Sequence, residues 1–322
     1  MIDIDDFCKV SALVIGDLMI DEYLWGSVDR ISPEAPVMVV SVEKQTHTLG
    51  GAGNVINNLK AMGANVEAIG MAGTGSAGRM IAEKFEALGI STDGIISEPD
   101  RPTTRKTRVV ASNQQVLRID REIKKQITRD SFGRLVKIMA RKIPEVDVII
   151  LSDYDKGLIT RELVNETVRL AEKHQIMVLA DPKALDFSKY EKVSILTPNR
   201  KEAGIAAHMD IRSNEDLIKA GQKIMAVARL EKLLITCGKD GMMLFETNEA
   251  PFAIASKACQ VFDVSGAGDT VIALLGLGLA VGASFKDSAK VANEAAGIVV
   301  AKVGTATASI PELKQALSVS LP

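Results

Sequence analysis

The sequence predicts an α/β fold, with one domain around a mostly parallel central sheet and a small second β-sheet. Three observations support this. Short apolar runs alternate with helix-like segments, several of these runs end in polar residues, and a proline-bearing strand-like stretch does not suit a central sheet. The 322 residues, 47% of them hydrophobic, suffice for one such domain.

The charge balance and the few cysteines and histidines argue against several classes of function. With 39 Lys and Arg against 41 Asp and Glu, no overall field favours nucleic acid or an anionic membrane. The three cysteines and three histidines are scattered, so neither a zinc site nor a Ser-His-Asp triad is expected. No apolar run has the length of a membrane span, and the N-terminus lacks a signal pattern. We expect a cytoplasmic protein with a small-molecule partner.

The first strand is expected at residues 10–15, and the chain then turns at Gly16 and Asp17. Asp17 follows the carboxyl end of a strand, where α/β proteins bind ligands, although a plain turn residue is an equal alternative. Residues 21–44 are strand-like but contain Pro33 and Pro36, which suits an exposed edge. This stretch is expected to form a small projecting sheet.

A glycine turn precedes the first long helix. Gly50 and Gly51 are followed by apolar residues at helical spacing, and Asn54 lies in the first turn of that helix. A Gly-Gly pair alone indicates a tight turn. Asn54 also offers a donor and acceptors to ligand hydroxyls. A structural role and a ligand-binding role both stay open for Gly51 and Asn54.

The spacing Gly73-x-Gly75-x-x-Gly78 matches a dinucleotide-binding fingerprint between a strand-like and a helix-like run. However, it does not open the first βαβ unit, and the candidate ribose-binding acid, Glu98, falls in a loop. We favour structural turn glycines over NAD or flavin binding.

Two strands around a turn at Asn113 are expected between residues 101 and 121. Their cations are Arg105, Lys106, Arg108 and Arg118. Such charges usually form a solvated strand edge. The alternative is a second anion pocket, for a phosphorylated substrate.

The βα rhythm then becomes regular, with strands expected at 146–151, 176–180, 193–196 and 233–236. Polar residues follow each of them, among them Asp153, Lys183, Asn199 and Glu202. Several strands that deliver such side chains to one sheet edge are typical of an α/β ligand site.

The stretch 263–270 is the strongest single motif, and an apolar helix follows it. Gly266 and Gly268 allow a sharp turn and close approach of a charged group, and the first amides of a helix stabilise an anion. Asp269 inside this turn would repel a resting phosphate. It is therefore either a helix cap or a general base that takes a hydroxyl proton during phosphoryl transfer. Two glycines flanking the carboxylate favour the base.

These motifs resemble those of the ribokinase-like (PfkB-type) carbohydrate kinases over essentially the whole chain. The matching segments are 50–54, 199–202 in the position of the NxxE motif, 236–238 and 263–270. The resemblance implies a three-layer αβα sandwich with a β-sheet lid from about 22–44 and 100–122. It also implies ATP and magnesium, a homodimer formed through the lid, and, as an open point, a monovalent cation such as potassium.

The resemblance also implies roles for individual residues. Asp269 would be the base, with the amides of Gly266, Ala267 and Gly268 as the anion hole. Asn199 and Glu202 would order magnesium through water. The ATP site would further include Thr236, Gly238, Gly241 and Asn293. The sugar would meet Asp17, Gly51, Asn54 and Asp153. The candidates for a distal phosphate are Lys106, Arg108, Arg118 and Lys183.

Further segments, among them 31–37 and 151–154, look like the kinase domain of the bacterial bifunctional heptose enzymes. That likeness implies ATP-dependent phosphorylation of the C1 hydroxyl of D-glycero-β-D-manno-heptose 7-phosphate, towards ADP-heptose for lipopolysaccharide core. The alternatives are a kinase for another sugar, a sugar phosphate such as fructose 6-phosphate or a nucleoside, a nucleotide-binding regulator, or a dehydrogenase. No His-x-Gly-His nucleotidyltransferase motif occurs, so adenylylation is expected from a separate protein.

Overall fold

The computed structural model describes residues 2–112, 114–183, 186–257 and 261–319. The expected turn residue Asn113 and the thiol of Cys259 lie outside these residues. None of the helices in the described ranges has the length and apolar content needed to cross a membrane.

Within the described residues, nine strands form the main sheet in the order β13-β12-β11-β10-β9-β8-β1-β4-β5. The pairs from β11 to β5 are parallel, and β12 and β13 add antiparallel strands at one edge. The strands are β1 (Ser11–Gly16), β4 (Asn65–Met71), β5 (Ile95–Ile96), β8 (Val148–Ser152), β9 (Met177–Asp181), β10 (Ile195–Leu196), β11 (Lys232–Thr236), β12 (Met242–Glu246) and β13 (Phe252–Ile254). The mostly parallel sheet expected from the sequence is confirmed.

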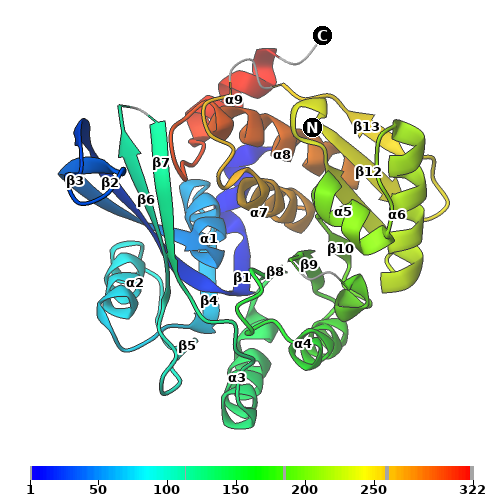
Figure 1. Cartoon of the computed structure of the whole chain (residues 1–322). Helices are drawn as coiled ribbons and strands as arrows, with labels where there is room; N and C mark the ends of the chain where they lie inside the picture. The colour runs from blue at the N-terminus through cyan, green and yellow to red at the C-terminus, as the bar shows by residue number, and fades with distance from the viewer. Residues whose placement is uncertain (1, 113, 184–185, 258–260, 320–322) are drawn as a thin grey trace.

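Helices cover both faces of this sheet and make three layers (Figure 1). One layer holds α1 (Ala52–Ala61), α2 (Ser76–Ala87), α7 (Ala267–Ala280), α8 (Phe285–Val300) and α9 (Ile310–Val319). The other holds α3 (Arg129–Lys142), α4 (Arg161–His174), α5 (Arg200–Ala207) and α6 (Asn214–Ala228). Along β1, Val14 packs in the first core and Ile15 in the second, because successive strand side chains point to opposite faces. Burial on both faces explains the continuous apolar runs.

A separate four-stranded sheet stands beside the main sheet (Figure 1). Its order is β3 (Met38–Gly51), β2 (Leu18–Ile31), β6 (Thr104–Ala111), β7 (Gln114–Arg121). β2 pairs with β6 in parallel, and both outer pairs are antiparallel. It covers the expected lid segments but is longer, since β2 starts at Leu18 and β3 reaches Gly51. The strand placement of Pro33 and Pro36 was wrong, because both lie in the connection between β2 and β3.

The start of α7 differs from most other helix starts. Thr128, Thr160 and Ser284 cap α3, α4 and α8 with their side-chain oxygens. At α7 the N-cap residue is Gly266, with a φ of 82°, and it gives no side-chain hydrogen bond to the helix. The Ala267 amide donates to the Val264 carbonyl at 3.3 Å, whereas the N-cap residue holds none of the amides that follow, and these can meet an anion.

Candidate active site

A cavity of about 150 Å³ lies at the carboxyl edge of the main sheet, and we call it the base cavity. Its walls come from the ends of the adjacent strands β8 to β11 and from the first turn of α7. The lining residues are Asp153, Tyr154, Asp181, Pro182, Lys183, Thr197, Asn199, Glu202, Thr236, Gly266, Gly268 and Asp269. The structure thus brings together the strand-end residues that the sequence assigned to one edge.

Asp269 is 3% exposed and hydrogen-bonded on both carboxylate oxygens. Asn54 Nδ2 donates to Oδ2 at 2.8 Å, and the Tyr154 hydroxyl donates to Oδ1 at 2.8 Å. These donors lie on other elements, so the described contacts of Asp269 are not those of a cap. Burial raises its pKa to about 6, and the two hydrogen bonds oppose that rise. Such a carboxylate is ionised at neutral pH and can take a proton.

The glycines of the α7 turn keep the base cavity open. A Cβ at Gly266 would lie 2.4 Å from Asn54 Nδ2, and the positive φ disfavours any side chain there. A Cβ at Gly268 would have Asp181 Oδ2, 3.9 Å away, as its nearest neighbour. The uncapped helix start between these glycines and Ala267 can stabilise negative charge.

Asn199 and Glu202 form a capping box at the start of α5. Asn199 Oδ1 accepts from the Glu202 amide at 2.9 Å, and Glu202 Oε2 accepts from the Asn199 amide at 3.0 Å. Glu202 Oε1 also accepts a hydrogen bond from Lys183 Nζ at 2.6 Å. The motif therefore has a structural reason as well as the magnesium role that the resemblance implies.

The donor chemistry of the base cavity fits a magnesium ion that keeps part of its water shell. Asp153, Asp181, Glu202 and Asp269 line the space, and Lys183 is the one cation among the described residues that line it. Burial and repulsion by Asp269 raise the pKa of Asp181 well above its usual value, so a cation would be stabilised here. The described residues contain no ready cluster of three or more His, Cys, Asp or Glu ligands. A role of Asn199 and Glu202 through water stays a prediction.

A second cavity, of about 420 Å³, adjoins the first and shares Thr236 and Gly268 with it. Of the six residues expected to bind the cofactor, Thr236, Gly238, Gly241 and Asn293 line it, whereas Asn199 and Glu202 line the base cavity. The other lining residues include Met242, Val261, Val264, Ala267, Val271, Ala296, Gly297 and Val300. An apolar, glycine-rich space next to an anion-binding turn suits a flat ring that carries phosphates. We call it the nucleotide cavity.

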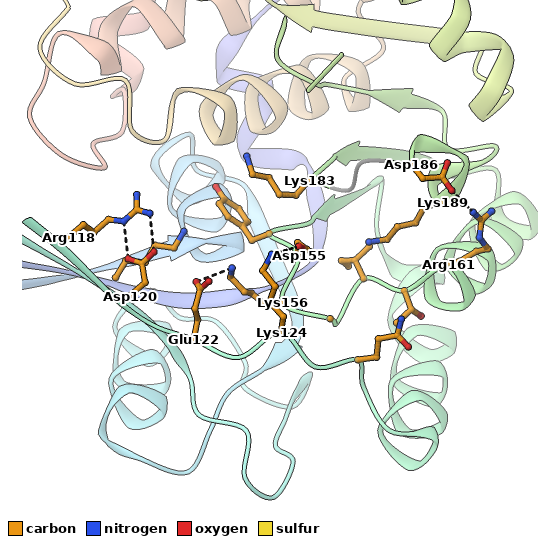
Figure 2. Close-up of a pocket in the computed structure, with 16 residues that line it drawn as sticks. Arg118, Asp120, Glu122, Lys124, Asp155, Lys156, Arg161, Lys183, Asp186 and Lys189 are labelled. Carbon is orange, nitrogen blue, oxygen red and sulfur yellow. Dashed lines mark hydrogen bonds and ion pairs between the residues drawn. The ribbon is translucent and has the colours of Figure 1, made fainter. Parts of the chain in front are cut away.

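A third cavity, of about 840 Å³, shares Tyr154 and Lys183 with the base cavity. Lys and Arg side chains reach it from the lid side and from the loops that follow β8 and β9 (Figure 2). They are Lys106, Arg118, Lys124, Lys156, Arg161, Lys183 and Lys189. We call it the cationic cavity.

Most cations of the cationic cavity already have a carboxylate partner. The pairs are Arg118–Asp120, Lys124–Asp155, Lys156–Glu122, Arg161–Asp186, Lys183–Glu202 and Lys189–Asp153. Lys106 has no ion pair within 4 Å among the residues that the structure describes. Its ammonium lies 5.5 Å from the centre of the Tyr154 ring. Burial and the nearby Lys156 lower the pKa of Lys106, so an incoming anion would be stabilised there.

Some expected sugar and phosphate contacts have other partners in the structure. Arg108 donates to Asp21 Oδ1 at 2.7 Å and lines none of the three cavities. Asp17, 5% exposed, accepts from the Tyr154 and Lys156 amides at 2.9 and 3.1 Å. Burial and the neighbouring Asp153 raise the pKa of Asp17 to about 6. Asp17 thus organises the loop after β8, and its sugar contact stays a prediction.

The structure also explains why glycine is found at position 51 and asparagine at position 54 without a ligand. Gly51 has a φ of 57°, and a Cβ on it would lie 2.6 Å from the Asp17 carbonyl. Asn54 is fully buried, and its Oδ1 has no hydrogen-bond partner among the described residues. Asn54 therefore contacts the candidate base directly, while hydroxyl binding by either residue remains a prediction.

Two of the three fingerprint glycines, Gly73 and Gly78, pack closely against backbone atoms, whereas a Cβ on Gly75 would meet nothing within 4 Å. A Cβ on Gly78 would lie 1.7 Å from the Gly73 carbonyl, and the Gly73 amide donates to Thr103 Oγ1 at 2.8 Å. Glu98, the ribose-binding candidate, pairs with Arg101 at 3.0 Å. These contacts agree with structural turn glycines.

Sequence reasoning did not assign site roles to Tyr154, Asp181, Lys156 or Lys189. Tyr154 and Lys156 lie in the loop that follows β8, and Asp181 is the last residue of β9. Their position at the carboxyl edge of the sheet was therefore the available signal. Lys189 lies in a short 3₁₀ helix (Phe187–Tyr190), and its pairing with Asp153 could not be foreseen from spacing.

Comparison with known proteins adds a family model and close relatives. A model described as "pfkB family carbohydrate kinase" matches residues 10–313. A protein of Desulfatibacillum aliphaticivorans named "Bifunctional protein HldE" is 52% identical over 315 residues, or 98% of this chain and 64% of that protein. A protein of the same name in Geobacter sulfurreducens is 47% identical over 304 residues, or 94% of this chain and 62% of that protein. The chain thus spans somewhat less than two thirds of these relatives.

Solved structures share the fold at low sequence identity. Arabidopsis thaliana ribokinase in complex with ribose and ATP gives a TM-score of 0.74 at 20% identity, over 96% of this chain and 98% of that one. Escherichia coli phosphofructokinase-2 in complex with potassium gives 0.79 at 17% identity, over 96% and 99%. The three-layer arrangement with a separate small sheet is therefore that of the ribokinase fold.

Proposed function

This chain belongs to the pfkB family of carbohydrate kinases, and we propose that it phosphorylates the anomeric C1 hydroxyl of D-glycero-β-D-manno-heptose 7-phosphate with ATP. Family membership makes it a phosphotransferase that acts on a sugar. The observation that carries the choice of a phosphorylated sugar is the cationic cavity, which meets the base cavity at Tyr154 and Lys183. The relatives named HldE support a heptose as that sugar.

In this proposal, Asp269 takes the proton of the C1 hydroxyl as its oxygen bonds to the γ-phosphorus and the bond to the β-phosphate oxygen breaks. The amides of the turn at Gly266–Gly268 stabilise the charge on the phosphoryl oxygens. Magnesium, when bound, supplies further positive charge to those oxygens. Asn199 and Glu202 would hold its water shell, and Lys183, which pairs with Glu202, would add positive charge beside them.

Lys106 is the side chain that we assign to the distal phosphate. It is the cation of this cavity without an ion pair among the described residues, and its position on β6 places it on the lid. Arg118 and Lys183 would have to share their charge with Asp120 and Glu202. A lysine already held by a carboxylate gains less from a new anion than one held by none.

The lid sheet would exclude water from the transfer and pair two subunits. Apolar side chains on it are exposed, namely Ile31, Val37, Met38, Val42, Leu117 and Ile119. These exposed apolar side chains support a homodimer formed through the lid. We place the enzyme in the cytoplasm, with potassium as a candidate activator, and expect a nucleotidyltransferase to convert the 1,7-bisphosphate to ADP-heptose for lipopolysaccharide core.

The test is ADP release from ATP and magnesium with four acceptors: the heptose 7-phosphate, unphosphorylated heptose, fructose 6-phosphate and ribose. The proposal expects strong turnover with the heptose phosphate alone, and loss of turnover when magnesium is chelated. Preference for fructose 6-phosphate would retain a sugar-phosphate kinase but reject the heptose. Preference for an unphosphorylated sugar would reject the distal-phosphate site.

A further inference from the structure

The loop after β8 is held at several points. Asp17 accepts hydrogen bonds from the amides of Tyr154 and Lys156, and Asp153 Oδ1 accepts one from the Asp155 amide at 2.8 Å. Lys156 also pairs with Glu122, in the segment that follows the lid, at 2.9 Å. A loop fixed at so many points presents its side chains at defined positions.

Tyr154 is the one aromatic residue that lines both the base cavity and the cationic cavity. Its hydroxyl donates to Asp269 Oδ1, and Lys106 lies over its ring. Burial and the charge of Asp269 raise the pKa of Tyr154 well above its usual value, so the phenol stays protonated and remains a donor. One side chain therefore contacts the candidate base with its tip and the candidate phosphate ligand with its face.

We propose that Tyr154 is a positioning residue that orients the Asp269 carboxylate and, as the wall between the two cavities, sets the distance between the reacting hydroxyl and the distal phosphate. The second half of this inference rests on the proposed function; the first half does not. A hydrogen bond to one lone pair of Oδ1, with Asn54 on Oδ2, fixes the plane of the carboxylate and leaves the other lone pairs for the substrate proton. An unphosphorylated sugar would miss Lys106 at the far side of the ring.

Tyr23 provides a matched control. Arg108 lies 5.3 Å from the centre of its ring, much as Lys106 lies over Tyr154. Its hydroxyl is buried, and the described hydrogen bonds to Asp269 come from Asn54 and Tyr154 and not from Tyr23. Tyr23→Phe therefore removes a buried phenol hydroxyl near a cation while leaving the base untouched.

The first test needs no substrate. Carboxyl carbons of ¹³C-labelled aspartate are titrated by NMR, with Asp269→Asn to identify the resonance. The charged groups near this carboxylate are Asp21, Lys106, Asp181 and Lys183, and all remain in the variants. Tyr154→Phe should move the Asp269 midpoint upward by about one pH unit, because a hydrogen bond to the ionised form is lost. Tyr23→Phe should leave it unchanged.

The second test separates orientation from spacing. Tyr154→Phe keeps the ring, so kcat should fall roughly tenfold with little change in KM for the sugar phosphate. Tyr154→Leu removes the wall as well, so KM for the sugar phosphate should rise and the preference over the unphosphorylated sugar should shrink. Thermal unfolding of each variant establishes that it is folded.

An unchanged or lowered Asp269 midpoint in Tyr154→Phe would overturn the positioning role, whatever the substrate is. A full preference for the phosphorylated sugar in Tyr154→Leu would overturn the spacing role. If Tyr154→Phe does not fold, ultraviolet titration of tyrosine ionisation in the wild type and Asp269→Asn decides the contact. One tyrosine should ionise at lower pH in Asp269→Asn, and identical curves would refute the interaction. Absence of turnover with every sugar phosphate would reject the proposed function and the spacing role that rests on it, while the titration would still decide the positioning role.

Discussion

Asn54 donates a hydrogen bond to Asp269 across 2.8 Å and so joins α1 to α7, between residues 215 positions apart in the chain. One turn further along α1, Asn58 Oδ1 accepts a hydrogen bond at 2.9 Å from Oγ1 of Thr270, the residue that follows Asp269 in α7. The two contacts fix α1 against α7, the helix that starts at the glycine turn. The candidate base is thus oriented by the same packing that forms the core.

Asp269→Asn should lower kcat by roughly two to four orders of magnitude, because the amide cannot take the hydroxyl proton. ATP affinity should change little, since the nucleotide cavity is intact. Steady-state kinetics and ATP binding by calorimetry measure the two effects. Activity within a few-fold of the wild type would show that Asp269 has only a structural role.

The pH dependence of turnover should follow Asp269. Its pKa of about 6 means that kcat rises as the pH increases through that region, where the carboxylate loses its proton. A kcat that is flat between pH 5 and 8 would argue against this base.

The contribution of Asp269 to the stability of the fold should fall as the pH rises, whereas kcat should rise. The folded-state pKa of Asp269 lies above its unfolded value, so the folded chain binds this proton more tightly. The stability that it contributes is complete at low pH and is lost as the pH rises from the unfolded value through about 6. The Tm of Asp269→Asn relative to the wild type should therefore increase between pH 4 and pH 7. A difference independent of pH would contradict the shifted pKa.

Gly268→Ala tests the open turn of α7. The added Cβ has space, with Asp181 Oδ2 at 3.9 Å, so the fold should be retained while the methyl group enters the position of the phosphoryl group. We expect kcat to fall by about 10²-fold, as for the loss of one anion-hole donor. Gly133→Ala, a helical position of α3 with nothing within 4 Å, is the control and should leave kcat unchanged. If Gly268→Ala and Gly133→Ala had the same kcat, the anion-binding role of the turn at Gly266–Gly268 would be rejected.

Lys106→Met tests the distal phosphate site. The change keeps the apolar stem but removes the charge, so KM for the sugar phosphate should rise by at least tenfold while kcat changes less. Lys137→Met, at an exposed position of α3, is the matched control. An unchanged KM in Lys106→Met would show that Lys106 does not bind the distal phosphate. Another cation of the cationic cavity, with Arg118 as the next candidate, would then have to bind it.

Much of the fold and of the site could be predicted from the sequence, because parallel strands leave both an apolar run and a polar ending. The cavity edge that holds Asp153 and Asn199 follows from that rule, and Asp269 was predicted from the glycine turn at the start of α7. The hydrogen-bond and ion-pair partners of the site residues could not be predicted in this way. The ion pairs of Lys183 and Arg108, and the contact between Tyr154 and Asp269, depend on which loops meet in space. Residue spacing carries no information on such contacts.

The central claim is that this kinase transfers phosphate to the anomeric hydroxyl of a sugar that already carries a distal phosphate. Phosphorus NMR of the product made from ATP and D-glycero-D-manno-heptose 7-phosphate tests it most directly. The account predicts a new phosphorus signal coupled to the anomeric proton, beside the retained 7-phosphate, and no such signal with Asp269→Asn. A new phosphate on any other carbon, or the same product from Asp269→Asn, would contradict it.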